Sequence, residues 1–72
     1  MKTTEAGLIV KHIIKSTGTT YEKFGDVFGF HKNTINAWVN GYQRPSYDDI
    51  LMIVDHYRLD ISQLRVEVKN AN

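Results

Sequence analysis

The sequence predicts a compact all-α domain built from five helices. At 72 residues the chain supports one hydrophobic core, because so short a chain buries only about 60% of its unfolded surface. Hydrophobic residues make up 42% of the chain and recur at helical spacing. Residues that start or end helices separate the apolar stretches. We expect the domain to cover residues 1–65 and a C-terminal tail to follow at 66–72.

The first helix is predicted from Thr4 to Ser16, with Gly18 as its stop signal. Its apolar face consists of Ala6, Ile9, Val10, Ile13 and Ile14. The second helix begins near Tyr21 after a threonine cap, and Glu22 stands three residues after Thr19, in the register of a capping box. Its inward residues are Phe24, Val27 and Phe28. Gly29 ends the helix, because glycine adopts a left-handed backbone without strain.

A third helix follows the turn at 29–31 and runs from Lys32 to about Val39. Ile35 and Trp38 face inward, and the tryptophan is interpreted as a packing residue. Asn40 and Gly41 form the stop. The outward positions are Lys32, Asn33, Asn36 and Ala37, so the outer side of this helix is mostly polar.

The fourth helix is predicted to start after Ser46, since its hydroxyl can cap a helix and two aspartates favour the positive N-terminal end. The helix extends to about Arg58 with Ile50, Leu51, Ile53, Val54 and Tyr57 as its apolar residues. Asp60 and Gln63 indicate a short fifth helix that ends near Leu64. Val66 and Val68 alternate with charged residues, which leaves a short strand across a dimer or a frayed end as alternatives.

Several classes of function are disfavoured by composition. The absence of cysteine excludes disulfides and thiolate sites, and the three histidines lack the spacing of a helical metal pair. The serines lie in no nucleophile motif. No signal peptide is evident, and no apolar run approaches the roughly 20 residues of a membrane span. We therefore expect a cytoplasmic protein in a bacterial host, with no enzymatic activity, cofactor, metal, small-molecule substrate or membrane contact.

The charge distribution is uneven although the net charge is only +1. No acidic residue lies between Val27 and Tyr47, and this stretch contains His31, Lys32 and Arg44. The middle of the chain is therefore locally positive. Two short helices joined by a glycine turn, with a polar outer side on the second, also form the pattern of a DNA-reading helix-turn-helix.

The stretch from Gly18 to Leu64 resembles the Cro/C1-type, or lambda-repressor-like, helix-turn-helix family. The matching positions are Gly18, Thr20, Phe24, Phe28, Gly29, Thr34, Ile35, Trp38, Asn40, Gly41, Pro45, Ser46, Leu59, Ile61 and Leu64. The resemblance implies a DNA-binding domain whose helix-turn-helix is formed by helices 2 and 3. As a whole, the chain is similar to the small early regulators of temperate-phage switches, most of all to modulators of repression from lactococcal phages.

The resemblance also implies a recognition face for operator DNA or for a cognate repressor. Its predicted members are Tyr21, His31, Lys32, Asn33, Thr34, Asn36, Ala37, Tyr42 and Arg44. Lys32 could donate to guanine, and Asn33 or Asn36 could pair with adenine. His31 replaces a serine that is frequent in the family, which leaves three roles open: phosphate contact, a weak helix cap, or contact with a protein partner.

Two functional hypotheses follow. In the first, the protein is an antirepressor that binds a CI-type phage repressor, with or without operator DNA. In the second, it is a Cro-like repressor that binds double-stranded operator DNA as a homodimer. Few cations reach the phosphates, and Tyr21, Ala37 and Tyr42 replace residues that contact DNA in the family, which favours the antirepressor. Tyr21, Phe30, Tyr42 and Tyr47 are then expected to form a protein-binding surface.

Overall fold

The computed structural model describes residues 4–71, and within this range it contains five helices and no strand. The helices are α1 (Glu5–Thr17), α2 (Tyr21–Phe28), α3 (Lys32–Asn40), α4 (Tyr47–His56) and α5 (Ile61–Ala71). The predicted all-α class is confirmed. Residues 1–3 and 72, which belong to the predicted domain and tail, lie outside the described residues.

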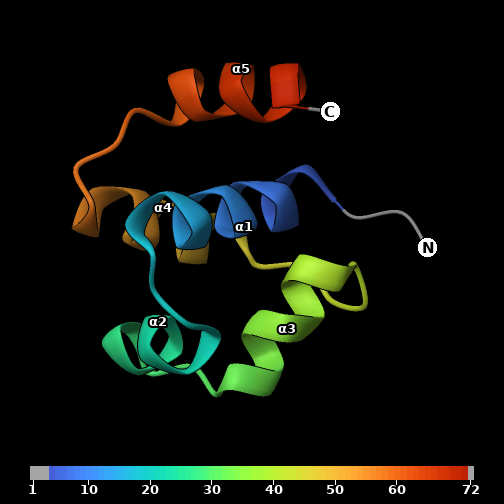
Figure 1. Cartoon of the computed structure of the whole chain (residues 1–72), viewed down its shortest axis with the longest axis vertical. Helices are drawn as coiled ribbons and strands as arrows, with labels where there is room; N and C mark the ends of the chain where they lie inside the picture. The colour runs from blue at the N-terminus through green and yellow to red at the C-terminus, as the bar shows by residue number, and fades with distance from the viewer. Residues whose placement is uncertain (1–3, 72) are drawn as a thin grey trace.

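One hydrophobic core joins all five helices. In Figure 1, α5 lies on one side of α1, while α2 and α3 lie on the other. The described residues contain no buried polar or charged side chain, so apolar burial holds the helices together. The core side chains are Ile9, Val10, Ile13, Ile14, Phe24, Ile35, Trp38, Val39, Ile50, Ile53, Val54, Leu64 and Val68.

Side-chain caps start the helices near the predicted positions. The hydroxyl of Thr4 accepts a hydrogen bond from the backbone N–H of Gly7 at 3.0 Å. Ser46 and Asp49 form a capping box at α4, in which each side chain accepts from the backbone N–H of the other residue. Asp60 accepts from the backbone N–H groups of Ser62 and Gln63 before α5. These bonds satisfy donors that have no partner inside the first helical turn.

One residue predicted to face inward and one apolar residue of the predicted fourth helix are exposed. Val27 on α2 is 52% exposed, and Leu51 on α4 is 40% exposed. Each lies roughly 100° around its helix from the buried stripe, which is too far to reach the core. Helix α4 also ends at His56, before the predicted Arg58, which has a left-handed φ of 54°.

The last helix is longer than predicted. Helix α5 continues to Ala71, so both alternatives for residues 66–71, a strand or a frayed end, were wrong. Val66 and Val68 looked like the alternating pattern of a strand. The pattern that determines the structure is the helical spacing of Leu64 and Val68, which are four residues apart and both buried. A hydrogen bond and an ion pair link α5 to α1: His12 Nε2 lies 3.1 Å from Glu67 Oε2, and Arg65 Nε lies 2.9 Å from Glu5 Oε1.

The junction between α2 and α3 depends on a glycine inside α2. Gly25 is buried, and its carbonyl oxygen accepts a hydrogen bond from the backbone N–H of Phe30 at 2.8 Å. A Cβ atom at this position would overlap the carbonyl oxygen of Phe30 and lie 3.4 Å from the side chain of Ile35. The turn can therefore fold back over α2 only because residue 25 has no side chain.

The substitution Gly25→Ala should destabilise the protein, although alanine is normally the better helix former. Overpacking of this kind costs about 1–3 kcal/mol and exceeds the propensity gain of about 0.5–1 kcal/mol. Urea unfolding measures the difference, with Ser16→Ala on the exposed side of α1 as a control expected to change little. A Gly25→Ala variant that is more stable than wild type would contradict the packing of this junction.

Val68→Ala tests the extension of α5. Removing this buried side chain should lower the free energy of unfolding by about 1–3 kcal/mol. The matched control is Val66→Ala on the same helix, because Val66 is 53% exposed and Val68 only 4%. Equal effects of the two substitutions in thermal or urea unfolding would show that residues 66–71 do not pack as a helix.

Candidate functional site

Helices α2 and α3 form a unit in which a short turn sets the position of the second helix. Gly29 ends α2 with a left-handed φ of 81°. Phe30 then turns inward, and its ring packs edge-on against Trp38 with the ring centroids 4.9 Å apart. Helix α3 begins at Lys32, and its inner side packs on the core through the buried Ile35 and Trp38. Its opposite side is left free for contact with another molecule.

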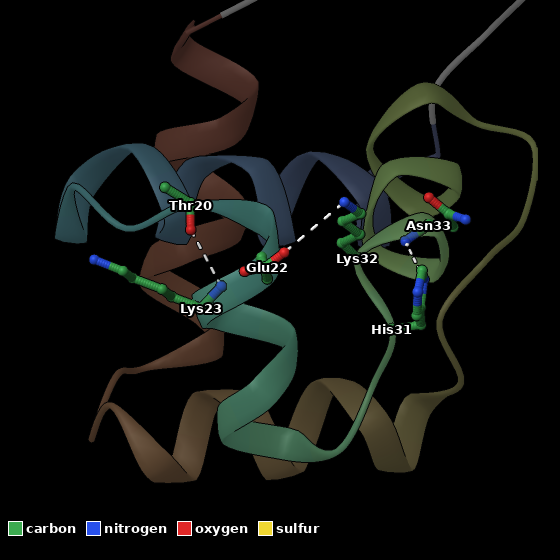
Figure 2. Close-up of polar contacts among 6 residues, drawn as sticks. All are labelled: Thr20, Glu22, Lys23, His31, Lys32 and Asn33. Carbon is green, nitrogen blue, oxygen red and sulfur yellow. Dashed lines mark hydrogen bonds and ion pairs between the residues drawn. The ribbon is translucent and has the colours of Figure 1, made fainter.

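His31 is the N-cap of α3. Its Nδ1 atom accepts a hydrogen bond from the backbone N–H of Asn33 at 3.0 Å (Figure 2). Its carbonyl oxygen accepts from the backbone N–H of Thr34 at 2.9 Å. Among the three roles that the sequence left open, this geometry corresponds to the cap.

The outer side of α3 is polar and mostly exposed. Lys32, Asn33 and Asn36 are exposed, whereas Thr34 and Ala37 are half-buried. The side-chain oxygen of Asn36 accepts a hydrogen bond from the side-chain nitrogen of Asn40 at 2.9 Å. Five predicted site residues, Lys32, Asn33, Thr34, Asn36 and Ala37, therefore lie on α3, with the His31 cap directly before them.

Glu22 belongs to the same surface although it was not among the predicted site residues. Its Oε2 atom lies 3.8 Å from Nζ of Lys32, so a carboxylate from α2 faces the first lysine of α3 (Figure 2). The predicted capping box with Thr19 is wrong: the cap of α2 is Thr20, whose hydroxyl accepts from the backbone N–H of Lys23 at 3.1 Å. The side chain of Glu22 can therefore reach α3.

The cations do not converge on one point. Lys23 is on α2, and its ammonium group extends away from α3 in Figure 2. Arg44 follows the end of α3 and lines a hollow of about 470 Å³ between α1, the start of α4 and α5. Lys32, at the start of α3, is paired with Glu22. The predicted positive face thus consists of separated charges.

The four aromatic residues expected at a protein-binding surface fall into two groups. Tyr21 and Phe30 are half-buried and pack against the core, so their rings contribute to the fold. Tyr42 and Tyr47 are 68% and 69% exposed. The left-handed Gly41 ends α3, and the backbone N–H of Tyr42 donates to the carbonyl of Ala37 at 2.9 Å, which fixes Tyr42 beside the end of this helix.

The described part of the chain offers no metal-binding group of three His, Cys, Asp or Glu residues. No helix among residues 4–71 is long and apolar enough to cross a bilayer. What this surface presents is a set of hydrogen-bonding side chains, one ion pair and one exposed tyrosine. Such groups can bind a macromolecule, by base and phosphate contacts or by contacts to another protein.

Residues 10–64 match a helix-turn-helix family, a stretch that includes α2, α3 and α4 and most of α1. Comparison with curated proteins and with solved structures gave no match. The match covers more than half of the chain, and the five-helix architecture fits the lambda-repressor-like all-α fold.

The substitution His31→Ala should remove the cap of α3 and lower the free energy of unfolding by about 0.5–2 kcal/mol. His31→Asn supplies another capping oxygen and should keep most of the stability. Urea unfolding followed by circular dichroism compares the two variants. If alanine proved as stable as wild type, the hydrogen bond between His31 and Asn33 would have no structural role.

Proposed function

Because the chain belongs to the helix-turn-helix family of DNA-binding transcription regulators, we propose that it acts in the genetic switch of a temperate phage as an antirepressor. In this role the surface formed by α2, α3 and Tyr42 binds the cognate CI-type repressor and changes its access to operator DNA. The observation that carries the proposal is the carboxylate of Glu22, which lies 3.8 Å from Nζ of Lys32 and places a negative charge beside the cation at the start of α3.

Affinity for DNA depends on the number of phosphates that lysine and arginine side chains neutralise. Lys32 is compensated by Glu22, Lys23 extends away from α3, and Arg44 lies beyond the other end of the helix. One copy of the chain therefore makes few phosphate contacts. Weak intrinsic DNA binding favours the antirepressor over a repressor that binds operator DNA on its own.

Tyr42 adds a feature typical of protein interfaces. Its side chain is largely exposed, while its backbone is held by the cap of α3. A tyrosine positioned in this way can bury a large area with little loss of conformational entropy, which is why tyrosines are frequent among residues that dominate binding energy. We infer that Tyr42 is an anchor for the repressor.

The alternative is a Cro-like repressor that binds operator DNA without help. The exposed Lys32, Asn33 and Asn36 on α3 favour it, because lysine and asparagine are suited to read guanine and adenine in the major groove. A homodimer would double the phosphate contacts and place two α3 helices about 34 Å apart, one turn of DNA.

The two functions differ in the partner that the purified protein binds. At physiological salt, fluorescent DNA from the switch region is mixed with the protein, with the cognate CI-type repressor, or with both, and complexes are followed by anisotropy and size. The antirepressor binds the repressor and shows no sequence-specific DNA binding on its own. Sequence-specific binding of DNA by the protein alone, without capture of the repressor, would establish the Cro-like alternative.

Tyr42→Ala should weaken capture of the repressor about tenfold or more, the effect of losing an anchor residue at an interface. Val66→Ala is the control, since Val66 is also exposed but lies on α5, away from α2 and α3. Titration calorimetry with the purified repressor measures both. Capture that is equal in Tyr42→Ala, Val66→Ala and wild type would remove Tyr42 from the interface.

A further inference from the structure

Glu22 is the one acidic side chain that contacts the start of α3 among the described ion pairs. It lies in the first turn of α2, and 68% of its side chain is exposed. Its partner Lys32 is the first residue of α3 and is 55% exposed. A negative charge is therefore present where the N-terminal ends of the two helices come together (Figure 2).

This position matters for any ligand of the surface. When a helix-turn-helix binds DNA, the first helix crosses the backbone and the N-terminal residues of the second enter the groove. Helix N-termini attract phosphate through their free backbone N–H groups and their positive dipole. Here the side chains of Thr20 and His31 already accept hydrogen bonds from backbone N–H groups in the first turns of α2 and α3. The carboxylate of Glu22 compensates the positive end of the α2 dipole. A phosphate would thus meet a negative charge.

The same carboxylate suits a cationic partner. Exposed ion pairs contribute little to stability, so Glu22 can exchange Lys32 for another cation at small cost. A protein that binds DNA presents lysine and arginine side chains on its DNA-reading surface. Among these, the planar guanidinium of arginine fits a carboxylate best, since it donates two parallel hydrogen bonds.

We propose that the Glu22 carboxylate takes the position of a DNA phosphate in front of an arginine on the DNA-reading surface of the repressor. This inference rests on the proposed antirepressor function and names the chemistry of its central contact. Glu22 then has two effects on specificity: it binds the cationic protein, and it lowers the affinity of the same surface for DNA.

The substitution Glu22→Gln tests both effects, because it removes the charge and keeps the size of the side chain. Affinity for the purified CI-type repressor should fall about tenfold, as expected for the loss of a charge-assisted contact. Affinity for duplex DNA should rise, and its dependence on salt should steepen by about one unit per subunit as Lys32 becomes free for phosphate. Calorimetry with the repressor and anisotropy with DNA at several potassium chloride concentrations give the two values.

Asp55→Asn is the matched control, since Asp55 is an exposed acid on α4, outside the surface formed by α2, α3 and Tyr42. It changes the net charge equally and should leave both affinities near those of wild type. Glu22→Asp retains the charge and should keep most of the affinity for the repressor. Melting temperatures of all variants confirm that the fold is intact.

Each contrary result has a distinct meaning. If wild type captures the repressor and Glu22→Gln captures it equally well, the role of Glu22 is overturned while the antirepressor function stands. If Glu22→Gln and Asp55→Asn weaken capture to the same degree, the effect is one of overall charge and the specific contact is refuted. If wild type does not bind the repressor at all, the proposed function fails and this contact fails with it.

Discussion

The arrangement of the candidate site depends on the close approach of the turn to α2 at Gly25. The hydrogen bond from Phe30 to the carbonyl of Gly25 brings the chain back over the helix it has just left. Phe30 can then pack on Trp38, and Ile35 can enter the core beside Gly25. The direction of α3, and with it the exposure of Lys32, Asn33 and Asn36, follows from this contact.

Much of the fold was predictable because local signals and the core pattern agree. Threonine or serine caps the starts of α1, α2 and α4, and glycine ends α1, α2 and α3. The inward positions of Phe24, Ile35 and Trp38 follow from helical spacing. Where local and tertiary signals differ, the prediction was wrong. Val68 looked like part of an alternating tail, but packing beside α1 makes the segment helical.

The candidate site was less predictable than the fold because it depends on contacts between helices. A capping-box spacing drew attention to Thr19 as the partner of Glu22, whereas the structure pairs Glu22 with a lysine ten positions later. Tyr21 and Phe30 were expected at the surface, but each ring finds space against the core. The sequence shows which residues are polar. Which charged side chains contact one another depends on how α2 and α3 are oriented, and only the structure shows that orientation.

The described residues bury no polar or charged side chain. The packing of the core therefore does not depend on the polar side chains that form the binding surface. Substitutions of exposed residues away from caps and special backbone positions usually change stability by less than about 0.5 kcal/mol. Mutations at Glu22, Asn33 or Asn36 can therefore accumulate without unfolding the domain. During evolution, such a domain can change its binding partner through successive single substitutions, because the protein stays folded after each of them.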